Sequence, residues 1–396
     1  MMDVQKLRNE TPGCQGKIHL NNAGASLMPR PVIQAMEDHI TLESLQGGYE
    51  AADQRTEEVS HFYDAVAALL NTTARNIAFS SSATNAYAKA LSCIPFETGD
   101  TIVIANEDYI SNQIAFLSLQ KRFGINLVRA ASLMEGGVDV ADMKRLIDLH
   151  HPRLVSLTHI PTNTGLIQPV EEVGRLCRER NILYLVDACQ SAGQLPLDVA
   201  AIGCDFLSAT FRKFLRGPRG AGFLYVSDRV LHENLEPLFI DMRGADWTQK
   251  NDYQARRDAR LFEEWELPYA LVLGSAKAVD YALAIGLKSI EDRNNSLCSL
   301  LRRQIETLPG VRTLDQGKHL SSIVTLSIPN QKPKDLLDAL RLRSINTSIS
   351  YRNFALIDFV AKGIEWALRI SPHYYNTEKE IESLVGALRD LNPGKS

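Results

Sequence analysis

The sequence predicts an α/β fold with one large, mainly parallel sheet and a smaller α+β lobe. Short apolar runs alternate with amphipathic segments through the middle of the chain, which is typical of strands and helices in alternation. Most of these runs show no polar alternation, as expected for strands covered on both faces. From about Leu261 the pattern changes to long helices with few short strands. These observations favour helices packed on a sheet, followed by a second lobe.

The predicted strands of the sheet are five apolar runs. They are Thr101–Ala105, Leu154–Thr158, Ile182–Asp187, Asp205–Ala209 and Phe223–Val226. Between the second and third runs, Val170–Glu179 has the spacing of an amphipathic helix, and Pro169 suits the start of that helix. The order strand, helix, strand predicts parallel neighbours in the sheet.

The smaller lobe is predicted from the C-terminal part of the chain. A helical pattern covers Ala270–Ala284, and a strand pattern covers Ser322–Ser327. Two further helices are expected at Lys334–Arg341 and Ile381–Asp390. We expect a large domain over residues 17–260 and a smaller domain formed by residues 1–16 and 261–396. No Pro/Gly-rich linker separates them, which predicts packed rather than tethered lobes.

Composition excludes several classes of protein. The 396 residues are 45% hydrophobic and 23% charged, with a net charge of −4, which is typical of a globular protein and argues against a nucleic-acid binder. The apolar runs are too short to span a bilayer, so we expect no membrane association. Six scattered cysteines without a CxxC pair indicate reduced thiols in the cytoplasm. The histidine and cysteine spacings predict no metal site.

Three polar clusters follow predicted strands, at the edge where ligands bind to open α/β sheets. Asp187 ends an apolar run, Lys213 follows another, and Ser80–Thr84 precedes a helical pattern at Asn85–Leu91. Each has an ordinary interpretation as well: a helix cap for Asp187 and for the serines, and a solvated side chain for the lysine.

Together the three clusters suit one cofactor, pyridoxal 5′-phosphate. Lys213 lies between Phe211 and Phe214 and beside Arg212, and apolar surroundings and a neighbouring cation both lower the pKa of a lysine. A lysine of that kind can form a Schiff base with an aldehyde. A carboxylate can hold a ring nitrogen protonated, and a helix N-terminus can hold a phosphate. The Gly217–Gly222 segment does not match GxGxxG, which argues against a dinucleotide.

At this point the sequence resembles the class V aminotransferase family, the cysteine desulfurase-like group of pyridoxal phosphate enzymes of fold type I. The resemblance extends from Asn21–Gly24 to Asn376–Thr377. Its most specific motifs are Asp187–Gln190, Lys213 with Gly217–Pro218, and Leu368–Thr377. It implies that Lys213 is the catalytic residue and binds the cofactor aldehyde. It also implies that Asp187 holds the pyridinium, and that Gln190 reaches the phenolic oxygen.

The resemblance implies further contacts with the cofactor. Its phosphate would be held by Ser82, Ala83, Thr84, Thr210 and Arg212, and its ring would stack on Tyr109. An asparagine of the family contacts the cofactor oxygen after the strand that ends at Thr158. Ungapped alignment places Thr162 at that position and Asn163 one residue later, so both stay open.

The substrate would be bound by four further residues. Arg369 would bind the substrate carboxylate as a bidentate fork, while Asn22, Ala23 and Tyr49 would line the pocket. In relatives, the segment that matches Phe262–Glu266 reaches the phosphate of the partner subunit. Here Trp265 and Glu266 replace the small residue and threonine of relatives, which leaves that contact open. The family implies a homodimer.

The same resemblance suggests a reaction. A persulfide-forming desulfurase needs a cysteine shortly before the substrate arginine, yet no cysteine follows Cys298, and Ser348–Gly363 contains none. Gly47–Ala52 and Asn346–Ser348 look like the ergothioneine-pathway C–S lyases and their isopenicillin N epimerase-like neighbours. We therefore expect a lyase that splits an S-substituted cysteine or its sulfoxide into pyruvate, ammonia and a sulfur product. The alternatives are an aminotransferase, an epimerase, a persulfide-forming desulfurase or a non-catalytic protein of this fold.

Overall fold

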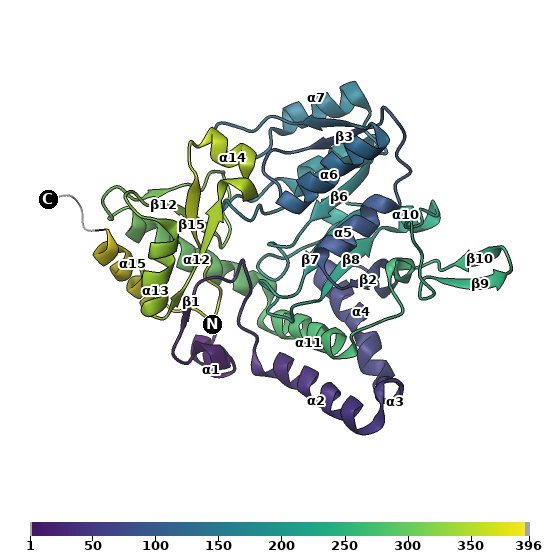
Figure 1. The fold of residues 1–396 in the computed structure, drawn as a ribbon, viewed down its shortest axis with the longest axis horizontal. Helices are drawn as coiled ribbons and strands as arrows, with labels where there is room; N and C mark the ends of the chain where they lie inside the picture. Colours follow the sequence, from purple (N-terminus) through teal and green to yellow (C-terminus); the bar gives the residue numbers. More distant parts are fainter. Residues whose placement is uncertain (1, 393–396) are drawn as a thin grey trace.

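The computed structural model describes residues 2–392 and shows two lobes packed side by side (Figure 1). The larger lobe is built on a seven-stranded sheet of order β2-β8-β7-β6-β5-β3-β4. Its strands are β2 Ile77–Ser80, β3 Thr101–Ile104, β4 Asn126–Arg129, β5 Leu154–Thr158, β6 Leu183–Asp187, β7 Phe206–Thr210 and β8 Gly222–Val226. All neighbours are parallel except β8, which is antiparallel to both β2 and β7. The predicted mainly parallel sheet is confirmed, with each predicted strand shifted by no more than a residue at either end.

The sheet is covered on both faces, which explains the apolar strands. Alternate residues of one strand enter two different cores: Val155 and Leu157 pack on one face, and Leu154 on the other. One face carries α4, α7, α8 and α11, and the other carries α5 and α6. Their bounds are α4 Thr56–Leu70, α5 Ala83–Ser92, α6 Ile110–Phe123, α7 Val140–His150, α8 Val170–Glu179 and α11 Tyr269–Ile285.

The smaller lobe has its own antiparallel sheet and core. The strand order is β11-β12-β15-β14, with β11 Arg312–Thr313, β12 Val324–Ser327, β14 Ser348–Tyr351 and β15 Trp366–Ile370. Its helices are α12 Leu287–Ile305, α13 Pro333–Leu342, α14 Leu356–Ala361 and α15 Glu378–Leu391. Near the N-terminus, β1 (Ile18–His19) pairs in parallel with β13 (Ile345–Asn346). This pairing joins the N-terminal segment to the smaller lobe.

Helix α11 differs from the predicted domain boundary at residue 261. It packs on α2 (Arg30–Gln46) and α4, and its buried face, including Val272 and Val279, belongs to the core of the larger lobe. The chain passes into the smaller lobe along α12, and the C-terminal half of α12 belongs to the core of the smaller lobe. The sequence signals a change of helix length at Leu261, but only packing assigns the helix to a lobe.

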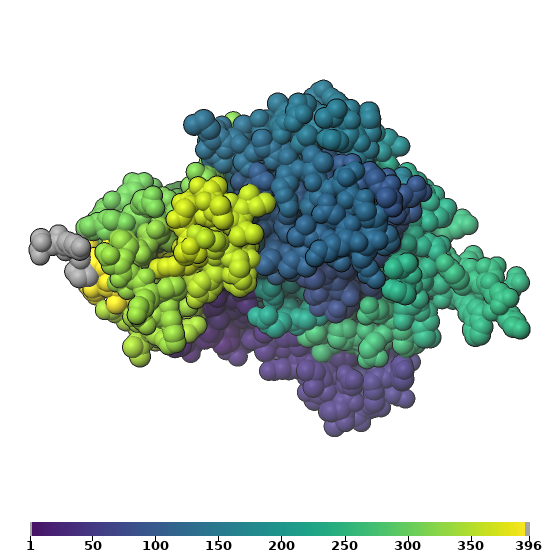
Figure 2. Space-filling model, turned by 45° about the horizontal axis from the view of Figure 1, so that its top comes forward, coloured from purple at the N-terminus to yellow at the C-terminus, as the bar shows by residue number. Residues whose placement is uncertain are grey.

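Two projections leave the body of the larger lobe. The hairpin of β9 (Ala245–Gln249) and β10 (Asp252–Ala255) extends from one end, and α2 with α3 (Gly48–Gln54) extends from another (Figures 1 and 2). Within residues 2–392, no single helix is long and apolar enough to cross a membrane. Helices α11 and α12 pass that test only as a pair, which is bent by 77°. Short helices α1 (Val4–Asn9), α9 (Val199–Ile202) and α10 (Asp228–His232) complete the fold.

Candidate active site

A cavity of about 190 Å³ lies where β5, β6 and β7 end, at the carboxyl edge of the parallel strands. This is the position expected for a ligand site in an open α/β sheet. The predicted cofactor-binding residues that line it are Ser82, Ala83, Thr84, Tyr109, Thr162, Asp187, Gln190, Thr210, Arg212 and Lys213. Asn163 is the exception. Strand order therefore brings together residues that are up to 131 positions apart, from Ser82 to Lys213 (213 − 82).

Lys213 is a buried amine that has no carboxylate partner within residues 2–392. Only 5% of the residue is exposed, and Phe211 and Phe214 beside it are buried. Burial and, to a smaller extent, Arg212 lower the pKa of Lys213 to about 8, against the opposing effects of Cys189 and Asp187. Its Nζ lies 5.9 Å from the ring centroid of Tyr109. About a tenth of this lysine is therefore a neutral nucleophile at pH 7, far more than of a free lysine.

Asp187 is a buried carboxylate held by neutral donors. The backbone N–H of Cys189 donates to its Oδ1 at 2.9 Å, and the amide of Asn112 donates to its Oδ2 at 3.1 Å. Among the described side chains no ion pair reaches Asp187. A buried carboxylate oriented in this way suits a cationic partner supplied by a ligand, such as a protonated ring nitrogen.

The opposite end of the cavity is built to bind an anion. Helix α5 begins there, and Ser82 caps it by accepting a hydrogen bond from the N–H of Asn85 at 3.1 Å. The backbone at Gly222 lies so close that an added Cβ would be 2.8 Å from the N of Ala83. Arg212 and Arg219 line the same cavity, and their guanidinium groups are close enough to repel each other. Two cations at a helix N-terminus predict a dianionic group between them.

The structure decides between Thr162 and Asn163. The hydroxyl of Thr162 lines the cavity and accepts a hydrogen bond from Gln190 Nε2 at 3.0 Å. The side chain of Asn163 points to the other side of the loop, where its amide donates to the carbonyl of Phe354 at 3.0 Å. The expectation that Asn163 contacts the cofactor is therefore wrong, because consecutive loop residues face opposite sides.

Arg369 is a buried cation that has no counter-ion in the part of the chain that the structure describes. It lies on β15, is 7% exposed, and donates only long hydrogen bonds: 3.4 Å to the carbonyl of Thr162 and 3.3 Å to Asn21 Oδ1. Its Nε has no partner. Burial, together with the smaller effect of Arg212, lowers the pKa of Arg369 to about 10. The guanidinium is close enough to lower the pKa of Lys213 slightly as well.

The predicted substrate residues on the N-terminal side have other roles in the structure. The amide of Asn22 donates to the carbonyl of Ser371 at 2.7 Å and its oxygen accepts from Tyr375, so Asn22 is fully engaged within the protein. The carbonyl of Ala23 accepts from Gln190 Nε2 at 3.1 Å, which positions Gln190. Tyr49 is 70% exposed on α3 and does not line the cavity, so its predicted pocket role is wrong within this chain.

Two residues of the candidate site were not predicted from the sequence. Arg219 lines the cavity, and its position after Gly217–Pro218, in the turn that follows Lys213, was the available signal. Asn112 holds Asp187 from the first turn of α6, a contact that no local sequence pattern predicts.

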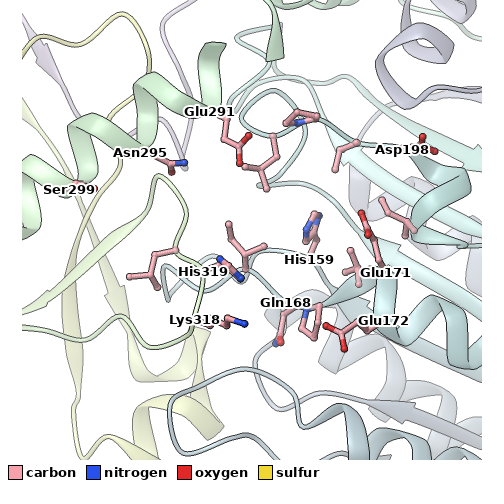
Figure 3. A pocket seen from close by; sticks show the side chains of 18 of the residues that line it. His159, Gln168, Glu171, Glu172, Asp198, Glu291, Asn295, Ser299, Lys318 and His319 are labelled. Atoms are coloured by element: carbon pink, nitrogen blue, oxygen red, sulfur yellow. The ribbon is translucent and has the colours of Figure 1, made fainter. Parts of the chain in front are cut away.

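A second, larger cavity of about 790 Å³ lies between the lobes (Figure 3). It is lined by the start of α8, by α12 and by the loop that carries Lys318 and His319. His159 projects into it, and burial lowers the pKa of His159 to about 4. Lys213 and Asp187 do not line this cavity, so it is separate from the cluster described above. Among the described residues no group of His, Cys, Asp and Glu side chains is suited to hold a metal ion.

Comparison with known proteins agrees with this geometry. The sequence model of the family described as Aminotransferase class-V matches residues 18–384. The chain belongs to the class V aminotransferase family. A relative named probable cysteine desulfurase, from Methanothermobacter thermautotrophicus, is 28% identical, with 98% of each chain covered. Class V enzymes use pyridoxal 5′-phosphate, so the predicted cofactor, fold and family are confirmed.

Two solved structures share the fold of this class V enzyme. An apo cysteine desulfurase from Thermococcus onnurineus superposes with a TM-score of 0.92 at 24% identity, covering 100% and 99% of the two chains. The cystine C–S lyase C-DES, described in complex with its product cysteine persulfide, superposes with a TM-score of 0.86 at 22% identity, covering 97% and 100%.

The residues of the cavity fit pyridoxal phosphate. The buried amine of Lys213, the cation-free carboxylate of Asp187 and the paired guanidinium groups at α5 match an aldehyde, a ring nitrogen and a phosphate in turn. In addition, Gln190 Oε1 is buried and has no hydrogen-bond partner, which is costly unless a ligand supplies one.

Proposed function

We propose that this class V enzyme is a C–S lyase that acts on an S-substituted cysteine or its sulfoxide and yields pyruvate, ammonia and a sulfur product. The observation that carries the proposal is Arg369, a buried guanidinium with no carboxylate and an unpartnered Nε, close to the reactive amine of Lys213. Such a group binds a substrate carboxylate in bidentate fashion and is unfavourable without one. An α-amino acid is therefore the substrate class that this arrangement supports.

When bound, pyridoxal phosphate supplies an electron sink that acidifies the Cα–H bond of the amino acid. Lys213 would hold the aldehyde carbon, and Asp187 the ring nitrogen. Arg212, Arg219 and the N–H groups at the start of α5 would hold the phosphate. Tyr109 would shield one face of the ring from water.

The lysine also accounts for the proton transfers. Once the substrate amine has taken its place on the aldehyde carbon, the neutral amine of Lys213 would take the proton from Cα, because burial keeps the pKa of Lys213 near 8. Arg369 would hold the carboxylate and so fix which Cα substituent faces Nζ. Loss of the sulfur substituent from Cβ would then leave an aminoacrylate, which water converts to pyruvate and ammonia.

The names of the relatives favour a second candidate, a cysteine desulfurase. Desulfuration through a protein persulfide needs a reactive thiolate near the substrate. Cys189 lines the cavity, but desolvation by burial raises the pKa of its thiol, which disfavours the thiolate. The segment Ser348–Gly363, which precedes β15, carries Ser348 and Ser350 and no cysteine. Serine cannot accept sulfur as a persulfide, and this supports elimination into solution instead.

We further propose that the protein acts as a homodimer. Large apolar side chains are exposed before the β9–β10 hairpin, at Leu238, Phe239 and Met242, and on strand β9 itself, at Trp247. Figure 2 shows that this hairpin stands clear of the body. A patch of this kind favours burial against a second copy. Sedimentation at micromolar concentration would test this, and a monomer throughout would refute it.

Substrate turnover tests the lyase. The enzyme loaded with pyridoxal phosphate is incubated with S-alkyl cysteines and their sulfoxides, and pyruvate, the sulfur product and the exchange of the Cα proton in heavy water are measured. Pyruvate formed in step with a thiol or sulfenate is expected. Exchange without pyruvate would indicate an epimerase or aminotransferase, and a protein persulfide would indicate a desulfurase. In Lys213→Ala, loss of both turnover and the visible absorbance of the bound cofactor is expected.

A further inference from the structure

Several hydrogen bonds join the two lobes beside the active site, such as those from Ser321 N–H to the carbonyl of Gly165 and from Ser322 N–H to Gln194, and one of them reaches the segment between β14 and α14. The amide of Asn163, in the loop after β5, donates to the carbonyl of Phe354 at 3.0 Å. Asn163 is 6% exposed, so water does not compete for this bond. The two residues are 191 positions apart. Phe354 lies between β14 and α14, in the segment that carries the nucleophile in desulfurases.

The residue before Asn163 is already part of the active site. Thr162 accepts a hydrogen bond at its hydroxyl from Gln190, and another at its carbonyl from Arg369. Two consecutive residues therefore connect three parts of the molecule: the cofactor-side amide of Gln190, the carboxylate-binding Arg369, and the small-lobe segment at Phe354. Lys213 and Asp187, which line the same cavity, make no such link to the smaller lobe among the described contacts.

The segment at Phe354 is connected mechanically to Arg369. Strand β14 pairs with β15 so that Ser348 lies opposite Arg369, and Phe354 follows six residues later (354 − 348). Beyond it, Phe359 of α14 is fully buried in a small core with Ala367 of β15. Movement of the segment is therefore transmitted to the strand that carries Arg369.

The direct link between Arg369 and the larger lobe is weak by comparison. Its bond to Thr162 is 3.4 Å long, against 3.0 Å for the bond of Asn163. A substrate carboxylate would take up the guanidinium donors that make the longer bond. The bond from Asn163 does not involve Arg369 and would persist while substrate is bound.

We infer that Asn163 is a positioning residue that latches Phe354 to the larger lobe and thereby holds Arg369 at the correct distance from Lys213 for an α-amino acid. This inference rests on the proposed function, since it assigns Arg369 to the substrate carboxylate. It differs from a cofactor contact, because Asn163 faces away from the cavity.

The test compares three variants. Asn163→Ala removes the donor, Asn163→Gln keeps an amide donor on a longer side chain, and Asn353→Ala changes an exposed asparagine of the same segment as a matched control. Asn163→Ala should raise KM for the amino acid about five- to tenfold, as expected for one lost buried hydrogen bond. The position of the visible cofactor band should not change. The amide of the same substrate, which cannot use Arg369, should keep its KM.

The two remaining variants complete the comparison. Asn163→Gln should recover part of the loss, and Asn353→Ala should behave as wild type. Equal increases in KM for the acid and the amide would show a general structural role and overturn the inference, and so would a shifted cofactor band.

A second measurement does not depend on turnover. Hydrogen exchange should be faster in peptides that cover residues 352–361 of Asn163→Ala, and unchanged in Asn353→Ala. Unchanged exchange in Asn163→Ala would refute the latch. If no S-substituted cysteine is converted, the proposed lyase fails, whereas the latch is still measured by this exchange and by the affinity for L-alanine, read from the visible band.

Discussion

Arg369 and Arg216 offer a direct comparison of two buried guanidinium groups. Both are almost fully buried, and neither has a carboxylate partner among the described residues. Arg216 donates short hydrogen bonds, 2.8 Å to the carbonyl of Leu27 and 2.7 Å to the hydroxyl of Tyr374, and lies 4.3 Å from the ring centroid of Tyr375. Arg369 has only two long bonds. The difference predicts that replacement by methionine changes the free energy of unfolding in opposite directions at the two positions.

For Arg369 the magnitude follows from the pKa. Burial lowers it from 12.5 to about 10, which corresponds to about 3 kcal/mol against the charged form. Loss of two long hydrogen bonds would cost about 1 kcal/mol in total. Arg369→Met should therefore raise the free energy of unfolding of the apoprotein by about 1–2 kcal/mol. Arg216→Met should lower it by about 2–4 kcal/mol, because it removes well-formed bonds and leaves their partners unpaired.

At Arg369 the same substitution should weaken substrate binding although it stabilises the apoprotein. Loss of a bidentate charged contact should raise KM for an amino acid by about 100-fold in Arg369→Met, with the cofactor band retained. The assays are urea unfolding of the apoproteins and steady-state kinetics of the loaded enzymes. An Arg369→Met apoprotein that is less stable than wild type would refute the idea that the buried guanidinium of Arg369 is an uncompensated charge when no substrate is bound.

Two further predictions concern the cofactor end of the cavity. Because the pKa of folded Lys213 is about 8 and that of a free lysine is 10.5, the unfolded apoprotein binds more protons between these values. The penalty from Lys213 is therefore complete below pH 8 and disappears as the pH rises to 10.5. Lys213→Met should be more stable than wild type by about 3 kcal/mol at pH 7 and equal to it near pH 10.5; a constant difference would contradict the assignment. Gly222→Ala should weaken cofactor binding about tenfold, as expected when the anion site loses one good hydrogen bond, because its Cβ would lie 2.8 Å from Ala83 N. Gly386→Ala, a helical glycine with open space, is the control; equal affinity in both would count against the close approach.

The fold, and the gathering of the candidate site residues at one edge of the sheet, were predictable from local patterns. Apolar runs such as Leu154–Thr158 and the amphipathic Val170–Glu179 have the bounds that the structure shows. Lys213 and Asp187 each follow such a run, and parallel strands place their ends at one edge of the sheet. The residue types and their order along the chain carried this information, since a strand buried on both faces must be apolar throughout.

Side-chain direction in loops was not predictable. Thr162 and Asn163 are neighbours in the sequence, yet one faces the cavity and the other faces Phe354. An alignment without gaps could not separate them. Arg219 reaches the anion end of the cavity because the turn after Lys213 folds back, which its position in the chain alone does not reveal.

The sequence by itself determined the elements, the mainly parallel sheet and the candidate site residues that follow its strands. Tertiary structure alone decided that α11 packs with the larger lobe, that Tyr49 is exposed, and that Arg369 is buried without a counter-ion. The physical reason is the range of the interactions. Periodicity and strand ends are set by near neighbours, whereas burial and charge compensation depend on contacts between segments far apart in the chain, such as Asn163 with Phe354.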